Sequence, residues 1–145
     1  MAKQVTFDAI KDRINKSAAD AVEDRLNHIA SYAVVVSPVD TGAYVESFSL
    51  LRQGSGGGRS KSSDARPNGV KKGNGGANPE QFREVARQNL TADIAGLNIQ
   101  QAIESGNTRF VLRNRAPHAN DVENGTNWKR TDGYYVFTKI RRKFG

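Results

Sequence analysis

A long helical stripe of apolar residues near the N-terminus constrains this fold more than any other feature of the sequence. Between Thr6 and about Ala33 the apolar residues recur every third or fourth position, at Phe7, Ile10, Ile14, Ala18, Val22, Leu26, Ile29 and Ala33. This spacing places them on one face of a helix that is about 40 Å long. The other face carries charges of both signs, which suits contact with water. The chain therefore has to build its core against one long amphipathic helix.

Different signals mark the two ends of this helix. Thr6 supplies a capping hydroxyl, and Asp8 in the first turn is favourably placed on the helix dipole. At the other end, consecutive valines weaken the helix preference, and Pro38 favours an extended conformation at the residue before it. We therefore expect the helix to stop near Ser37.

A turn motif follows the helix directly. It consists of Pro38, Val39, Asp40, Thr41 and Gly42. Because Gly supplies unusual dihedral angles and Asp and Thr oxygens bond nearby amides, the motif predicts a tight turn. Residues 47–50 then alternate polar and apolar, as a half-buried strand does. A catalytic role for Asp40 is disfavoured, because no partner acid, His or nucleophile lies near it in the sequence.

Residues 52–79 form a basic, glycine-rich insertion that breaks every pattern around it. The stretch is so poor in apolar groups that burial cannot offset its ordering entropy, so alone it should be mobile. Long loops in small domains are usually functional or disordered. A phosphate-binding loop is rejected, because residues 54–59 lack the final Gly-Lys-Ser/Thr. We retain a strand-to-strand hairpin that extends on assembly and contacts neighbouring subunits or DNA.

The second half of the chain predicts a helix, an ambiguous segment and a strand. The run Asn78–Glu80 is a good helix start, and the apolar spacing after it supports a helix to about Ala95. Residues 99–104 fit either another helical turn or a strand. Residues 109–113 are the best strand candidate in the chain, with turn residues on both sides.

A second turn motif ends this strand. Its residues are Arg113, Asn114, Arg115, Ala116, Pro117, His118 and Ala119, followed by Val122, Glu123, Asn124 and Gly125. Pro117 favours the start of a short helical segment that Gly125 closes. A metal site made of His118, Asp121 and Glu123 matches no standard ligand spacing, and we expect no metal there.

The C-terminal tail carries a third helical signal. Val136, Ile140 and Phe144 share helical spacing, so we expect a short terminal helix or a strand-to-helix transition after Gly133. The last residues of this segment are basic. Cations at a helix C-terminus complement the helix dipole, which gives them a structural explanation as well as a functional one.

Positive charge is concentrated in the insertion and in this tail. The chain has 22 Lys and Arg against 15 Asp and Glu, a formal net charge of +7. Such clusters attract polyanions or acidic protein surfaces, and a solvated loop and tail is the plain alternative. Trp128, in a polar and basic loop, suits a protein interface or stacking on a base, or simply covers the core edge. The candidate interface or DNA-facing residues are Arg52, Arg59, Lys61, Arg66, Lys71, Lys72, Trp128, Arg141, Arg142 and Lys143.

Taken together, these elements predict a single domain over residues 1–145, with residues 52–79 inserted in it. The expected fold class is α+β: a long N-terminal helix and a second helix packed on a small antiparallel sheet, with a long flexible Gly-rich hairpin loop. The absence of cysteine excludes a disulfide framework and a thiolate metal site. No stretch approaches the roughly 20 apolar residues of a membrane helix, and the N-terminus lacks a signal-peptide segment. We therefore expect a protein made in a cytoplasm, without a membrane partner.

The order of these features resembles one protein family. A long helix, Pro-Val-Asp-Thr-Gly, a variable loop, a short strand ending in Asn-x-x-Pro-aromatic-Ala and then Glu-x-Gly is similar to the HK97 gp10-like family of tailed-bacteriophage neck and tail-completion proteins. The resemblance covers most of the chain outside residues 52–79. The chain differs in His118, where the family usually has Tyr, and in Asn124, where Phe or Tyr often precedes the Gly. The structural-motif positions are Pro38, Val39, Asp40, Thr41, Gly42, Asn114, Pro117, His118, Glu123 and Gly125.

This resemblance implies a structural virion protein at the neck or tail end, made in the host cytoplasm, with no enzymatic activity and no cofactor. The implied partners are copies of itself in a cyclic hexamer, head-closure or connector and tail-tube proteins, and transiting double-stranded DNA. It also implies that His118, Ala119 and Val122 face inward and that Glu123 satisfies backbone amides or a basic neighbour. The alternative interpretation is a small basic nucleic-acid-binding protein, which strong, salt-sensitive DNA binding by the monomer would distinguish.

Overall fold

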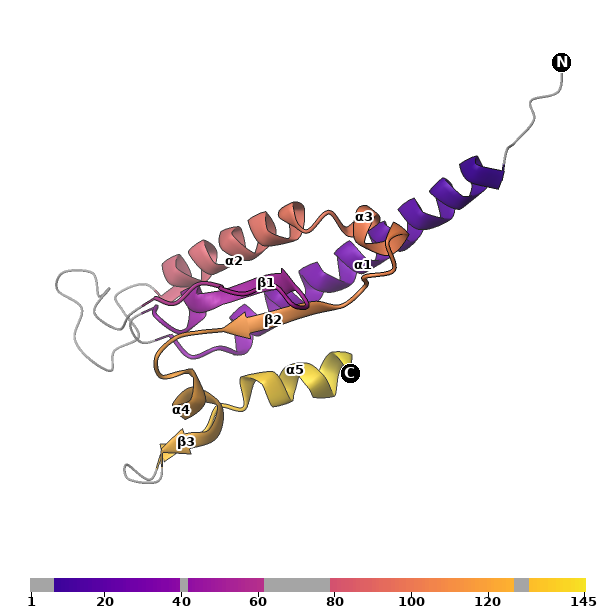
Figure 1. The fold of residues 1–145 in the computed structure, drawn as a ribbon. Helices are drawn as coiled ribbons and strands as arrows, with labels where there is room; N and C mark the ends of the chain where they lie inside the picture. Colours follow the sequence, from indigo (N-terminus) through magenta and orange to yellow (C-terminus); the bar gives the residue numbers. More distant parts are fainter. Residues whose placement is uncertain (1–6, 40–41, 62–78, 127–130) are drawn as a thin grey trace, which may run out of the picture.

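A long N-terminal helix, α1 (Phe7–Val36), forms one side of the protein (Figure 1). The computed structural model describes residues 7–39, 42–61, 79–126 and 131–145. The elements after α1 are a 3₁₀ turn (Val45–Ser47), β1 (Phe48–Arg52), α2 (Pro79–Gly96), α3 (Ile99–Glu104), β2 (Phe110–Asn114), α4 (Ala119–Asn124), β3 (Gly125–Thr126), β4 (Thr131–Asp132) and α5 (Val136–Phe144). The predicted α+β class is confirmed, with a second helix beside a small antiparallel sheet.

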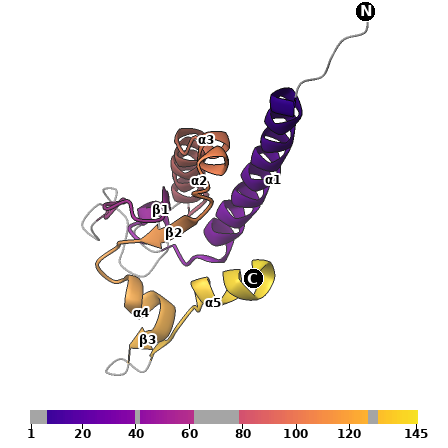
Figure 2. The same ribbon diagram turned by 45° about the vertical axis from the view of Figure 1, so that its right-hand side comes forward.

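Burial along α1 does not follow the whole of the predicted stripe. The buried residues of the helix are Ala19, Leu26, Ala30, Ala33 and Val34. The prediction is wrong at the start of the stripe, where Phe7, Ile10 and Ile14 are exposed. The reason is tertiary: α2, α3 and α5 are the elements that pack on α1, and its first turns project beyond them in both views (Figures 1 and 2).

The other end of α1 lies where the sequence predicts it. The helix continues through the valines because Val34 is fully buried, and burial outweighs the weak helix preference of a β-branched residue. The Ser37 hydroxyl donates to the carbonyl of Ala33 at 2.5 Å and satisfies one acceptor of the last turn. Thr6, the expected cap at the start, lies outside the described residues.

The strands β1 and β2 pair in antiparallel fashion, with Leu50 opposite Leu112 and Phe48 opposite Asn114. Both strands were predicted, and β1 also packs against α2. A second, very short antiparallel pair joins β3 to β4 beside α4.

One apolar core joins segments that are far apart in the sequence. Its fully buried members include Val34 of α1, Val45 of the 3₁₀ turn, Phe48 of β1, Leu90 of α2 and Val136 of α5. The terminal helix therefore closes the core, and Figure 2 shows α5 lying next to α1. None of the helices in the described part of the chain is both long and apolar enough to cross a membrane.

The ambiguous segment after α2 is a helix. Ile99 and Ala102 of α3 are buried, and the element packs against α1, which selects the helical alternative. The helices predicted after Pro79, after Pro117 and at the C-terminus are all present as α2, α4 and α5.

The insertion does not connect two strands of a hairpin in the described residues. Residues 53–61 form no strand, and the partner of β1 is β2, which comes only after α2 and α3. The hairpin prediction therefore does not hold for this part of the insertion. Residues 62–78 lie outside the described residues.

Candidate functional site: the junction of the two motifs

The two turn motifs meet in space through a side-chain amide. Asn114 at the end of β2 donates from Nδ2 to the carbonyl of Tyr44 at 2.7 Å, just after the first motif. Its Oδ1 accepts from the amide of Ala116 at 3.0 Å. Asn114 thus uses both ends of its amide, and the second motif is held in place relative to the first.

Gly42 can be replaced by no other residue without strain. Its φ is +80°, and a Cβ built on it would lie 2.4 Å from Cδ1 of Phe82 on α2. Its carbonyl accepts from the amide of Glu46 at 2.9 Å. The prediction of a turn that requires glycine is confirmed here. Pro38 and Val39 are half-buried, and Asp40 and Thr41 lie outside the described residues.

Tyr44 is the centre of the junction and is only 3% exposed. Its ring contacts Phe48 edge-on at 5.3 Å and tilts against His118 at 6.4 Å. Burial raises the pKa of Tyr44 above its ordinary value, and the charge of Glu123 raises it further. Its buried hydroxyl has no hydrogen-bond partner in the part of the chain that the structure describes, and burial favours the neutral form of Tyr44. His118 packs inward, as the resemblance implies.

Glu123 ties α4 to the terminal helix. Its carboxylate accepts from the amides of Phe137 and Thr138 at 2.9 and 3.1 Å and from the Thr138 hydroxyl at 3.1 Å. A carboxylate at a helix N-terminus satisfies unpaired amides and complements the dipole. The implied role of Glu123 in satisfying backbone amides is confirmed. Gly125 follows α4 with φ of +79°.

The first part of the insertion is fastened across the sheet, and we call residues 55–61 the strap. The guanidinium of Arg59 binds both carboxylate oxygens of Asp93 on α2, at 2.6 and 2.7 Å. It also donates to the carbonyl of Phe48 at 3.0 Å. Asp93 in turn accepts from the amide of Leu50 at 3.0 Å. This two-point ion pair fixes the strap to β1 and α2 together.

Further contacts fasten the strap near both motifs. Lys61 pairs with Glu46, which is only 6% exposed and follows the first motif. Ser60 donates to the carbonyl of Arg115 in the second motif at 2.7 Å. Arg113 of β2 donates to the carbonyls of Ser55 and Gly57. From its composition alone the insertion was predicted to be mobile, and that prediction did not include the contacts that fasten residues 55–61.

The candidate cations fall into separate environments. Arg52 donates to the carbonyls of Leu97 and Asn98 at 2.9 and 3.0 Å, and the strap cations Arg59 and Lys61 bind acids of the same chain. The last turn of α5 is exposed and carries Arg141, Arg142 and Lys143. Arg66, Lys71, Lys72 and Trp128 lie outside the described residues.

Sequence analysis missed the two acids that hold the strap. Asp93 falls among Leu90, Ile94 and Leu97, so it lies on the apolar side of α2. Glu46 stands between the apolar run Ala43–Val45 and Phe48, and it is itself buried. An acid inside an apolar stripe is the signal for a charge partner elsewhere in the chain, because buried carboxylates are normally paired.

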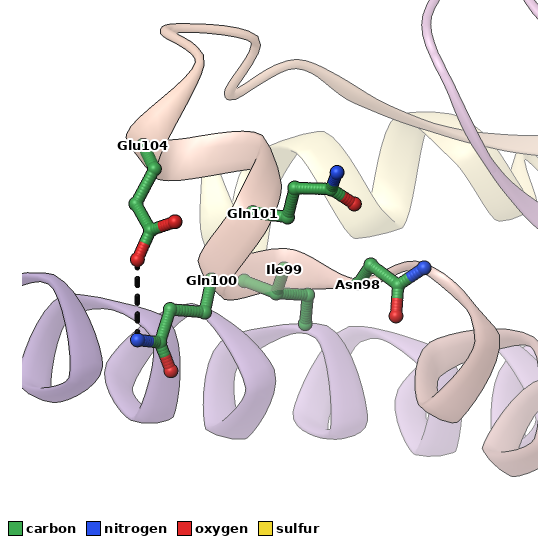
Figure 3. A pocket seen from close by; sticks show the side chains of 5 residues that line it. All are labelled: Asn98, Ile99, Gln100, Gln101 and Glu104. Atoms are coloured by element: carbon green, nitrogen blue, oxygen red, sulfur yellow. Dashed lines mark hydrogen bonds between the residues drawn. The ribbon is translucent and has the colours of Figure 1, made fainter.

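The described residues hold no group of His, Cys, Asp and Glu suited to a metal ion. A shallow pocket at α3 is lined by Asn98, Ile99, Gln100, Gln101 and Glu104 (Figure 3). Within it Gln100 donates to Glu104 at 3.3 Å, and its lining contains no nucleophile paired with a base. What the junction does is fix the shape of the backbone where two turns, the strap and α5 meet.

These features define an α+β protein whose two motifs form a structural junction. No family model, no curated protein and no solved structure matches the chain.

Proposed function

We propose that this protein is a structural virion protein of a tailed bacteriophage, a ring-forming neck or tail-completion subunit at the head–tail junction, similar to a tail terminator. The observation that carries the proposal is the contact between Asn114 and the carbonyl of Tyr44, which joins the two motifs of the family resemblance. Both motifs act on backbone geometry, which suits an assembly part. In this role no bond is made or broken.

The strap supports a role in assembly. By fastening residues 55–61 to β1, β2 and α2, it fixes the place and direction in which the insertion leaves the fold. In a closed ring, identical insertions then reach identical places on neighbouring copies. The family resemblance suggests six copies. Head-closure or connector proteins and tail-tube proteins are the partners above and below.

Electron microscopy of a phage whose copy of this gene is disrupted tests the proposal. We expect filled heads and finished tails that lie unjoined, or tails of abnormal length. Complementation with the unchanged gene and with Asn107→Ala should restore joined particles, because Asn107 is exposed and remote from the junction. Asn114→Ala should restore them poorly. Normal infectious virions without the gene would overturn the structural role.

The second candidate function is nucleic-acid binding, and the exposed basic turn of α5 favours it. Arg141, Arg142 and Lys143 lie together at the helix end, in a chain with a net charge of +7. In a ring these cations face either passing DNA or an acidic surface. Binding of duplex DNA by the free protein, measured from low to physiological salt, separates the two candidates. A steep loss of affinity with salt, removed by changing all three residues to Ala, would favour a DNA-binding protein.

A further inference from the structure

The first turns of α1 expose a stripe of large apolar side chains. Phe7, Ile10 and Ile14 are 79%, 44% and 63% exposed. Because successive residues of a helix are about 100° apart, these side chains lie on the side of α1 away from the core residues Leu26 and Ala30. Figure 2 shows α1 at the edge of the fold, with α2, α3 and the sheet to one side of it and α5 beyond its lower end.

An apolar groove lies on the same outer side of α1, at its other end. Its lining residues are His28, Ser31, Tyr32, Val35, Lys143 and Phe144. Val35 is 58% exposed, and Tyr32 meets Phe144 edge-on at 5.7 Å to form one wall. The groove has a volume of about 300 Å³ and an apolar lining. It is large enough to accept bulky side chains from another helix.

Stripe and groove belong to one repeat along the helix. Phe7, Ile14, Ala21, His28 and Val35 recur at every seventh position. A seven-residue repeat keeps one seam of a helix facing a second helix along its whole length. The core uses the other side of α1, and within the described residues the end of α5 borders this seam only at the groove. Ala21 and Ser17, in the middle of the seam, are small enough to let two helix backbones approach closely.

We propose that the seam binds a second copy of this chain, in an antiparallel dimer that packs α1 against α1. Stripe and groove of one copy cannot meet, because Ile10 and Tyr32 are about 33 Å apart along a straight helix. Phe7 and Val35 are equally far from Ala21. A two-fold axis at Ala21 therefore puts Phe7 opposite Val35 of the partner subunit, and each stripe fills the groove of the other copy.

The groove walls and the size of the face agree with this occupant. The groove is bordered by cations: Lys143 lies over the Tyr32 ring at 4.7 Å, and Arg25 lies over the Phe144 ring at 5.8 Å. The 30-residue helix is about 45 Å long and 10 Å across. Together with the wall that α5 supplies, a face of this size would bury about 600 Å² on each partner. This area is near the lower limit for a specific interface. The dimer is therefore a reversible one.

Sedimentation equilibrium tests the proposal on the full chain. The unchanged protein should reach twice the chain mass of 15.8 kDa as its concentration rises. Ile14→Glu in the stripe and Val35→Glu in the groove should each weaken self-association at least tenfold. Val85→Glu is the matched control, because Val85 is an exposed apolar residue of α2 outside the seam. Far-UV circular dichroism confirms that each variant is folded.

The absence of cysteine allows a second, geometric test. Ala21→Cys should form an inter-copy disulfide on mild oxidation, because Ala21 lies at the two-fold axis. Ala92→Cys, at an exposed alanine of α2, should not. A chain that stays monomeric at all concentrations overturns the proposal, and so does a larger assembly that Ala21→Cys does not cross-link. The outcome is independent of the virion role, because it concerns the free protein in solution.

Discussion

The strap and the first turns of α1 each pack differently from what their compositions predict. The strap is polar and rich in glycine, yet ion pairs and hydrogen bonds fasten it to β1, β2 and α2. The first turns of α1 have regular apolar spacing, yet Phe7, Ile10 and Ile14 face solvent. Apolar spacing predicts that a helix forms, whereas what a segment packs against depends on groups that are remote in the sequence.

Different forces hold the two regions. The strap is held by directional contacts to a few acids and carbonyls, so removing one acid should loosen all of it. The α1 helix is held by apolar burial of its later turns, so its first turns contribute little to the stability of the monomer. Mutations in the two regions should therefore have effects of very different size.

The largest effect on stability is expected at Gly42, whose carbonyl binds the amide of Glu46, the partner of Lys61 in the strap. Gly42→Val should lower the free energy of unfolding by about 3–4 kcal/mol, because it adds backbone strain and a clash with Phe82. Gly54→Val is the control: Gly54 also has a positive φ, but no atom lies within 4 Å of its added Cβ. Urea denaturation measures both. Equal losses at the two positions would remove the packing explanation.

The next largest effect is expected at Asp93. Asp93→Ala should cost about 2–3 kcal/mol, because it removes the bidentate partner of Arg59 and the acceptor of the Leu50 amide. It should also speed tryptic cleavage after Arg59, since the strap loses its main anchor. Glu84→Ala, which removes only a surface pair with Arg87, should cost less than about 0.5 kcal/mol. Slow cleavage of the Asp93 variant would show that the strap does not depend on this ion pair.

The raised pKa of Tyr44 predicts that the stability of the protein depends on pH. Its pKa is raised in the folded state, so above the ordinary tyrosine pKa of about 10 the unfolded chain loses a proton that the folded one keeps. Stability should then fall as pH rises, by up to about 1.4 kcal/mol per pH unit from this one group. Tyr44→Phe should flatten the slope of unfolding free energy between about pH 10 and 11. Tyr134→Phe, at an exposed tyrosine, should leave the slope unchanged.

The smallest effect is expected in the stripe of α1. Ile14→Ala should change the stability of the monomer by less than about 0.5 kcal/mol, because the side chain is already in water. Leu26→Ala on the same helix should cost about 2–4 kcal/mol, because Leu26 is in the core. Thermal unfolding at low protein concentration compares the two. Similar losses would mean that the first turns of α1 are packed within the monomer.

Much of the fold could be predicted because its signals are local. The end of α1 near Ser37, the start of α2 at Pro79 and the glycine turn at Gly42 each depend on a proline, a glycine or a run of a few neighbours. The roles of Glu123 and His118 followed from the family resemblance, and both agree with the contacts observed.

By itself, the sequence determined where α1, α2 and the strands β1 and β2 form, and that Gly42 needs a positive φ. Only the tertiary structure decided that α3 is helical, which side of α1 is buried, and that Arg59 of the insertion pairs with Asp93. The physical reason is the distance along the sequence over which each kind of interaction acts. Dihedral preferences and caps act over a few residues, whereas burial and charge pairing depend on which remote segments the chain brings together.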